Sequence, residues 1–283
     1  MAFAATLARE AELSGIGLHG GLPCRAVFRP APSGQGIRFF RSDIAGSQPI
    51  PASLECVNST VRGTNLSRGG AEVYTVEHIL SACAGLGISD LDVLLDAPEP
   101  PIIDGSALAF ARLFREAGIK FYATPLKRFT ITAPVSYSDG PVSYSAEPSA
   151  GPEFFCIYES KHPLVRHQEL SFGFGPGDYE ARIAPARTFA FEEELDYLRA
   201  NGLAKGGSLE NAVVIRRDSF LSGEGGLRFP DEMVRHKLLD MLGDFLLLGA
   251  PPGRVKITAR GGGHKHNIAF ARRLLDTFSL TED

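Results

Sequence analysis

Two histidines and an aspartate in this chain have the residue types and spacing of a metal site. His236 and Asp240 are four residues apart in an apolar-patterned segment, and Asp244 follows after four more. An α-helix would stack all three on one face, with about 40° of drift at each step. Neutral imidazole and carboxylate are normal zinc ligands, and a catalytic zinc usually keeps three protein ligands and one water position. The predicted third ligand is His78, which has the corresponding early helical position in the first half.

Each of these residues also has an ordinary explanation when it is taken alone. A lone histidine is more often a surface or core residue. A His and Asp pair at i, i+4 is usually a solvated pair on a helix. The metal site therefore depends on two halves of the chain facing each other, so that His78 comes close to His236.

Glu77 has a suitable position for a general base. It directly precedes His78 and lies about 100° from it around a helix, so it would flank a metal ion rather than bind it. Zinc lowers the pKa of the water that it binds towards ~7, and a neighbouring carboxylate can take the proton as that water attacks a carbonyl carbon. The alternative is that Glu77 only favours the positive end of its helix. No second histidine follows His78 at i+4, so the HExxH arrangement is absent.

His264 is the candidate general acid. Three glycines at 261–263 precede it, and such residues let the backbone approach a ligand and leave a side chain exposed. If Asp244 pairs with His264, the imidazolium form is favoured, which suits a group that stabilises an oxyanion and then protonates a leaving amine. The alternative is a linker histidine after a turn, and the nearby His266 weakens a unique choice.

The hydrophobic pattern predicts the elements that must position these residues. Residues 22–74 alternate short apolar runs with Pro, Gly and Ser breaks, as strands and turns do. From Thr75, apolar residues at 3.6 spacing predict a helix that Thr75 caps and that stops at Gly85 or Gly87. The other predicted elements are a strand at 91–95, a helix at 106–117, a helix capped by Asp231 and closed by Gly249, a strand at 254–259 and a last helix.

The order of elements in the two halves indicates a duplicated unit. The tetrapeptide AFAR occurs at 109–112 and again at 269–272, each time inside the final predicted helix of its half. The match of tetrapeptide and element order predicts two α/β units with a boundary in the polar segment near 121–128. We therefore expect domains at 1–121 and 127–283, with an insertion in the second at about 188–226.

Composition and charge exclude several classes of protein. The chain has 283 residues, 44% of them hydrophobic and 22% charged, as in soluble globular proteins. A net charge of −4 gives no broad positive field, so we expect no attraction to nucleic acid or anionic membranes. The start of the chain has no secretory signal and no run is long enough to span a membrane, which predicts a cytoplasmic protein. The cysteines form no CxxC pair, and we expect small buried residues at Cys24, Cys56, Cys83 and Cys156.

Seven blocks of sequence resemble the UDP-3-O-acyl-N-acetylglucosamine deacetylase family, in order and across essentially the whole chain. Ordered blocks of this kind are far more specific than a single motif. The blocks are SGIGLHGG from Ser14, TVEHILSACAGLGISDLDV from Thr75, PIIDGSA from Pro101, ARTFAF from Ala186, NGLAKGGSLENAVV from Asn201, RFPDEMVRHKLLDMLGD from Arg228 and GGHKHN from Gly262.

The resemblance implies a fold, a reaction and a set of site residues. The fold would be α+β, with two similar domains, each a sheet layered with helices, packed face to face around one metal site. The reaction would be removal of acetate from UDP-3-O-acyl-N-acetylglucosamine, the committed step of lipid A synthesis in Gram-negative bacteria. The implied metal ligands are His78, His236 and Asp240. Glu77 would be the general base, His264 the general acid oriented by Asp244, and Thr188 would support the oxyanion. Lys237 and His19 would contact the polar part of the substrate, and Leu18 and Phe189 would line a passage for the acyl chain.

Some choices stay open at this point. The metal would be Zn²⁺, although a site of two histidines and one aspartate also suits Fe²⁺. The partner would be a small UDP-linked acylated amino sugar, and we expect a monomer. The alternatives are a zinc deacetylase of another acylated amino sugar, or a non-catalytic sugar-nucleotide-binding protein that would not need to keep the ligands and the base. The chain departs from the common family pattern at Ala190, Lys265, His266 and Glu210.

Overall fold

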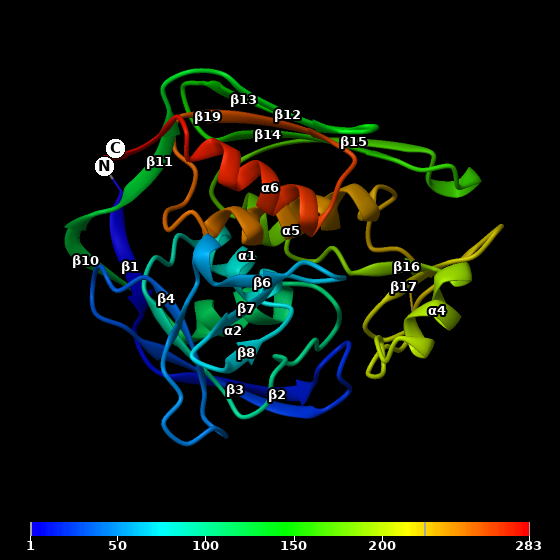
Figure 1. The fold of residues 1–283 in the computed structure, drawn as a ribbon, viewed down its shortest axis with the longest axis horizontal. Coiled ribbons are helices and arrows are strands. Elements are labelled where there is room, and N and C mark those ends of the chain that lie inside the picture. Colours follow the sequence, from blue (N-terminus) through cyan, green and yellow to red (C-terminus); the bar gives the residue numbers. More distant parts are fainter. Residues whose placement is uncertain (1, 224, 283) are drawn as a thin grey trace.

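Two five-stranded sheets lie on opposite sides of a layer of helices. The computed structural model describes residues 2–223 and 225–282. Figure 1 shows four helices between the sheets, which are α1 (Glu77–Leu86), α2 (Leu108–Ala117), α5 (Glu232–Leu246) and α6 (His264–Leu274). The first sheet has the order β2 (Ala11–Ile16), β3 (Pro23–Pro30), β9 (Leu91–Leu95), β4 (Ile37–Arg41) and β5 (Ile50–Pro51). The second has the order β12 (Val135–Asp139), β13 (Val142–Pro148), β19 (Val255–Arg260), β14 (Glu153–Glu159) and β15 (His167–Gly173). The α+β fold class that the sequence predicted is confirmed.

The two sheets have the same topology. In each, the third strand of the order pairs antiparallel with the second and parallel with the fourth, as β9 does with β3 and β4, and β19 with β13 and β14. Alternate residues of β9 and β19 are buried, because one face of each sheet packs towards the helices. The repeated AFAR segments lie in α2 (Leu108–Ala117) and α6 (His264–Leu274). This repeat supports the duplication, while the domain boundary near 121–128 stays a prediction.

Helices α1 (Glu77–Leu86) and α5 (Glu232–Leu246) form the centre of the molecule. Both are buried around most of their circumference, since they pack on each other and on further elements. Helix α1 also packs on α2, and α5 also packs on α6 and on β14. Helix α1 begins one residue later than a cap at Thr75 predicted, because Thr75 has a φ of 53° and donates its hydroxyl to Glu99 at 3.0 Å. Gly87 ends the helix in the left-handed region, as predicted. Asp231 precedes α5, but its carboxylate binds Arg235 rather than the helix backbone.

Gly243 allows α1 and α5 to touch through their backbones. A Cβ atom at this position would overlap the carbonyl group of Glu77 and would lie 3.0 Å from its Cα. Gly243 lies between Asp240 and Asp244 on α5, so this close approach also sets the distance from Glu77 to both aspartates.

Gly243→Ala is expected to destabilise the fold by about 1–3 kcal/mol, because neither backbone can give way without moving a helix. Chemical denaturation of the purified variant measures the change in the free energy of unfolding. Gly151→Ala is the matched control, since a Cβ there meets nothing within 4 Å. An equal loss in the two variants would contradict the proposed close packing.

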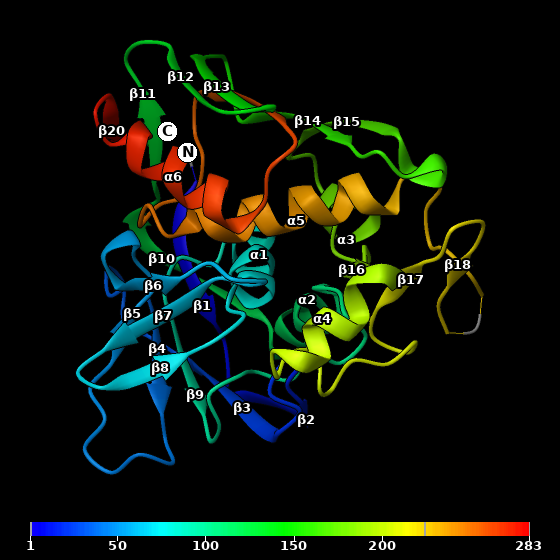
Figure 2. The same ribbon diagram turned by 45° about the vertical axis from the view of Figure 1, so that its right-hand side comes forward.

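Residues 189–221, within the range that the sequence predicted to be an insertion, contain a small sheet beside the main layers. The elements of this range are β16 (Phe189–Phe191), α4 (Leu195–Ala200), β17 (Val213–Ile215) and β18 (Phe220–Leu221), and Figure 2 shows them together at one side of the molecule. The short helix α3 (Asp178–Arg182) precedes this range. A similar small sheet in the first half contains β6 (Val57–Ser59), β7 (Asn65–Arg68) and β8 (Ala71–Val73).

Two strand pairs lie near the ends of the chain. They are β1 (Phe3–Leu7) with β10 (Ile119–Pro125), and β11 (Lys127–Ile131) with β20 (Phe278–Glu282). Single 3₁₀ turns occupy Leu54–Cys56, Pro163–Val165 and Glu192–Glu194. All four cysteines are free thiols, three of them buried and Cys56 partly exposed. Among the described helices, none has the length and apolar character needed to cross a membrane.

Candidate metal centre and its cavity

His78, His236 and Asp240 come together where α1 and α5 face each other. One ligand atom from each lies within 4.8 Å of the others, and all three side chains are buried. The two imidazole rings have centroids 5.3 Å apart. The fold therefore unites a histidine from the first half with two residues from the second, as the sequence predicted for a shared site.

The hydrogen bonds of the two histidines leave one ring nitrogen of each directed into the site. Nδ1 of His236 lies 3.1 Å from the carbonyl oxygen of Ala186, and Nδ1 of His78 lies 3.3 Å from that of Ser106. A carbonyl only accepts, so each Nδ1 carries the proton and each Nε2 presents a lone pair. Metal-binding histidines commonly make this outer hydrogen bond.

The buried acceptors fit a cation. Burial lowers the pKa of His236 to about 4 and also lowers the pKa of His78, so both rings are neutral at neutral pH. Nε2 of His236 lies 3.2 Å from Oδ1 of Asp240, and that oxygen has no hydrogen-bond donor among the described residues. Two acceptors this close, without a proton between them, repel each other unless a positive charge joins them. A divalent ion with two imidazole ligands and one carboxylate ligand would satisfy all three atoms.

Asp240 stays ionised in spite of its burial. Burial by itself raises the pKa of the carboxyl, but interactions with the neighbouring His236, Lys237 and His264 outweigh this effect and hold the pKa well below its usual range. Nζ of Lys237 donates to Oδ2 of Asp240 at 2.9 Å and lies 5.4 Å from the ring centroid of Phe189. Lys237 therefore lies at the edge of the metal group and faces the cavity.

Glu77 and His264 face each other beside the metal group. Oε1 of Glu77 lies 3.5 Å from Nε2 of His264, and its Oε2 accepts from the backbone N–H of Thr64 at 2.9 Å. Burial raises the pKa of Glu77 to about 7, although the charge of His264 opposes the shift. Burial would lower the pKa of His264, but the carboxylates of Asp244, Glu77 and Asp240 raise it to about 10. One group can thus exchange a proton near neutral pH while the other stays protonated.

A buried network fixes the orientation of His264. Its Nδ1 donates to Oδ2 of Asp244 at 2.9 Å, so Nε2 points at Glu77 and the metal group. Asp244 also accepts from the hydroxyl of Thr64 and from the side-chain amide of Asn267. The pairing of His264 with Asp244 that the sequence suggested is present.

A cavity of about 440 Å³ opens from the metal group. It is bounded on one side by α5 and the start of α6, and on the other by β16 and the loop at 60–63. Lys265 and His266, where the chain departs from the common pattern of the family that it resembles, also line this cavity. Of the residues that the sequence proposed for substrate contact or oxyanion support, the cavity includes Leu18, Thr188, Phe189 and Lys237.

His19 lies instead on the wall of a neighbouring pocket of about 280 Å³. Both of its ring nitrogens meet backbone groups, since Nε2 lies 3.0 Å from the carbonyl oxygen of Arg62 and Nδ1 accepts from the N–H of Ala204. This pocket is lined largely by residues between 188 and 221 and is mostly apolar, with side chains from Leu195, Leu198, Leu209, Ala212, Val214 and Leu221. Leu18, Arg62, Thr188 and Phe189 border both cavities.

Several residues that the sequence did not propose as site residues shape this region. Glu99 is buried and accepts from the N–H groups of His19 and Gly20, so it holds the SGIGLHGG loop. Thr75 and Arg62, at the cavity, have φ values of 53° and 61°. Non-glycine residues rarely adopt such angles, and the surrounding contacts must hold them there. No local pattern marks these positions, because their partners are distant in the chain.

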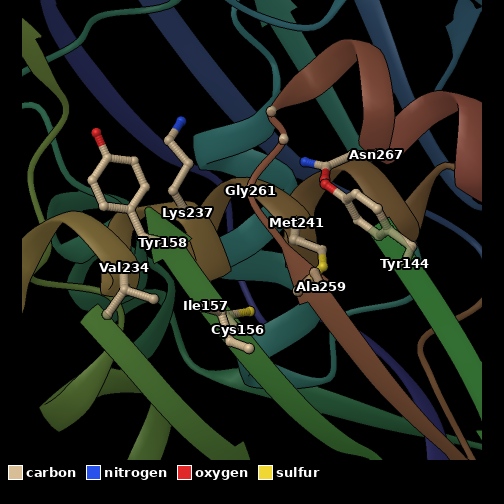
Figure 3. Close-up of a pocket in the computed structure, with 12 residues that line it drawn as sticks. Tyr144, Cys156, Ile157, Tyr158, Val234, Lys237, Met241, Ala259, Gly261 and Asn267 are labelled. Atoms are coloured by element: carbon tan, nitrogen blue, oxygen red, sulfur yellow. The ribbon is translucent and has the colours of Figure 1, made fainter. Parts of the chain in front are cut away.

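The glycine turn before His264 has a packing role behind the cavity. A small hollow of about 10 Å³ lies under this turn. In Figure 3, Tyr144 and Asn267 lie on one side of the turn, and Lys237 and Tyr158 lie on the other. The hydroxyl of Tyr144 donates to Oδ1 of Asn267 at 2.7 Å. A Cβ at Gly262 would overlap that hydroxyl, so glycine is needed for the turn to lie on the tyrosine.

Comparison with known proteins agrees with the ordered sequence blocks. The family model for UDP-3-O-acyl N-acetylglycosamine deacetylase matches residues 4–276. A UDP-3-O-acyl-N-acetylglucosamine deacetylase of Myxococcus xanthus is 43% identical over 98% of this chain and 88% of its own. Proteins of the same name from Anaeromyxobacter dehalogenans and Helicobacter pylori are 41% and 39% identical, each over 95% of this chain and 86% and 90% of their own. The resemblance is confirmed, and this chain belongs to the UDP-3-O-acyl N-acetylglycosamine deacetylase family.

Proposed function

We propose that this chain is a metal-dependent hydrolase that removes acetate from UDP-3-O-acyl-N-acetylglucosamine, the committed step of lipid A biosynthesis. The observation that carries the proposal is the convergence of three buried acceptors with Glu77 and His264 on one cavity. The names of the relatives supply the substrate class. A non-catalytic binding protein would not need to keep a general base and a general acid beside a metal group.

In this proposal His78, His236 and Asp240 hold a zinc ion. A bound zinc would lower the pKa of an attacking water and polarise the amide carbonyl. Two imidazoles and one carboxylate also suit Fe²⁺, so metal analysis has to decide between the two ions. His236 and His78 donate from Nδ1 to the carbonyl oxygens of Ala186 and Ser106, respectively. These hydrogen bonds direct the Nε2 atoms of both rings into the site without a bound ion.

The other residues move protons and orient the substrate. Glu77 takes the proton of the attacking water, for which a pKa of about 7 is well matched near neutral pH. His264, held as imidazolium by Asp244, stabilises the developing oxyanion and then donates its proton to the leaving amine. Thr188, which lines the same cavity, supports the same oxyanion. The roles of Glu77 and His264 are supported by their positions and charges at the cavity, and the role of Thr188 is supported by the family resemblance.

The two adjoining cavities are suited to different parts of the substrate. Lys237 faces the polar cavity and is suited to an anionic or hydroxylated part of the substrate. The apolar pocket of the predicted insertion, entered past Leu18 and Phe189, is suited to the acyl chain. His19 borders the entrance to the apolar pocket, and its contact with the polar part of the substrate stays a prediction.

The proposed setting follows from the same activity. We place the enzyme in the cytoplasm as a monomer that binds a small UDP-linked sugar and no nucleic acid, which is supported by a net charge of −4. We also propose that residues 1–121 and 127–283 act as two domains that close around the metal.

Purified, metal-loaded protein is expected to release acetate from UDP-3-O-acyl-N-acetylglucosamine and to leave a free amine. Acetate and amine are measured together, and the same assay with other N-acetylated sugars tests the narrower substrate class. Release from another acylated amino sugar, with none from the UDP-sugar, would move the proposal to a different deacetylase. Metal binding without any amide cleavage would favour a binding protein.

A further inference from the structure

A buried ion pair lies just outside the cavity, between Arg187 and Glu232. The two residues are 3% and 0% exposed. Nε of Arg187 donates to one carboxylate oxygen of Glu232 at 2.8 Å and Nη2 donates to the other at 3.1 Å. Glu232 begins α5, one helical turn before His236. Neither residue lines the cavity and neither was singled out in the sequence.

The carboxylate of Glu232 also accepts hydrogen bonds from the backbone of two separate segments. It accepts from the N–H of Arg187 at 3.0 Å and from the N–H of Arg228 at 2.7 Å. Nη2 of Arg187 in turn donates to the carbonyl oxygen of Gly226 at 2.7 Å. Four donors therefore converge on one buried carboxylate, which offsets the cost of removing its charge from water. The start of α5 is joined in this way to both 185–188 and 226–228.

The first of these segments orients one metal-group histidine. Ala186, next to Arg187, supplies the carbonyl that accepts from Nδ1 of His236. Thr188, on the other side of Arg187, reaches the cavity, and its N–H donates to Gly105 at 2.8 Å. Arg187 therefore lies between Ala186, which orients His236, and Thr188, which lines the cavity.

The second segment reaches the other histidine. Nη1 of Arg228 donates to the carbonyl oxygen of Pro185 and lies 2.8 Å from Oδ2 of Asp104. Asp104 accepts from the N–H and the hydroxyl of Ser106. The carbonyl of Ser106 is the group that accepts from Nδ1 of His78. One connected set of hydrogen bonds therefore runs from Glu232 to the outer nitrogen of each histidine.

We propose that Glu232 and Arg187 are positioning residues for the reaction, which hold the carbonyl of Ala186, and with it His236, in the geometry that the metal and substrate require. The inference rests on the proposed function for its kinetic readout only. The competing explanation is a purely structural pair that stabilises the fold and has no effect on the metal group. Replacing a buried ion pair by apolar residues often leaves stability unchanged, so stability and positioning can be separated.

The first test is Glu232→Gln, with Co²⁺ as the metal probe. Glutamine keeps the shape of the side chain but offers one acceptor oxygen in place of two. Arg187 therefore loses one of its two side-chain hydrogen bonds to residue 232. We expect a changed ligand-field absorption spectrum of bound Co²⁺, because the direction of His236 changes. We also expect about a 10- to 100-fold loss in Co²⁺ affinity or in kcat per metal-loaded chain, with a smaller change in KM. All measurements are made well below the melting temperature of the variant.

The second test is the double variant Arg187→Met with Glu232→Met, which removes both charges together. We expect its melting temperature to lie above that of Glu232→Met alone, which leaves the charge of Arg187 buried and unpaired. It should stay below that of the wild type, because the N–H groups of Arg187 and Arg228 lose their acceptor, and the Co²⁺ spectrum and kcat should stay altered. If Glu232→Gln does not fold, Arg187→Lys takes its place, since it keeps a cation beside Glu232 without the planar fork. It should alter the Co²⁺ spectrum with a smaller loss of stability.

Asp92→Asn is the matched control. Arg38 and Asp92 form a similar two-bond pair between β4 and β9, away from both cavities, with distances of 2.8 Å. This variant should lose some stability and keep the wild-type Co²⁺ spectrum and kcat.

A wild-type spectrum, Co²⁺ affinity and kcat in folded Glu232→Gln, or in folded Arg187→Lys, would overturn the inference. Recovery of all these properties together with melting temperature in the double variant would do the same. The proposed function fails separately, if metal-loaded wild-type protein releases no acetate. The Co²⁺ spectrum still reports on the positioning role in that case.

Discussion

Glu77→Ala is expected to lower kcat by about 10²- to 10⁴-fold while the protein keeps its metal, because a general base is lost. Glu77 lies beside the metal group without belonging to it, and its carboxylate faces His264 at 3.5 Å. Its raised pKa, about 7, is the value of a base that can take a proton near neutral pH. Steady-state kinetics with the UDP-sugar, combined with metal analysis of the same sample, measures both parts of this prediction.

Glu77→Gln separates proton transfer from packing. The amide keeps the volume of the side chain and can still accept from the N–H of Thr64 through its oxygen. It cannot take a proton, so its kcat should be as low as that of Glu77→Ala. Glu180→Gln serves as the control, because that carboxylate pairs with Arg115 outside both cavities, and its kcat should not change. A normal rate in either Glu77 variant would remove this residue from the mechanism.

The second large effect is expected from His78→Ala, which should lose the metal and, with it, activity. His78 is the ligand that α1 contributes, and without it the ion would keep only the two ligands of α5. Loss of an outer hydrogen bond typically costs about 10- to 100-fold in metal affinity, and loss of a ligand should cost more. Metal content after dialysis against a weak chelator, followed by the acetate assay, measures the effect.

Asp240→Ala provides an independent check of the same site. This variant should weaken metal retention as His78→Ala does. Asp240 lies on α5 and His78 on α1, but a ligand atom from each would bind the same ion. His167→Ala is a control for general effects of losing a histidine, because His167 lies at the surface beside Glu169. Wild-type metal content and activity in the two site variants would show that the ligand assignment is wrong.

Local sequence patterns were enough to predict most of the elements and the approximate site. The 3.6 spacing of apolar residues marked α1 and α5, and the spacing of His236 and Asp240 placed them on one helical face. The start of α1 was predicted one residue too early. Thr75 has the residue type of a helix cap, but its hydroxyl binds Glu99, which is 24 residues away. A tertiary contact replaced the local one, and propensity carries no information about such a choice.

The sequence by itself determined which chemical groups are available and along which helical face they lie, because periodicity and residue type are local properties. The tertiary structure alone decided which ring nitrogens carry protons, which acceptors are left without donors, and how far burial shifts the pKa values of Glu77 and His236. Each of these depends on desolvation and on partners from the other half of the chain. The pairing of Arg187 with Glu232 belongs to the same class, since 45 residues separate two side chains that meet only after α5 packs against the 185–188 segment.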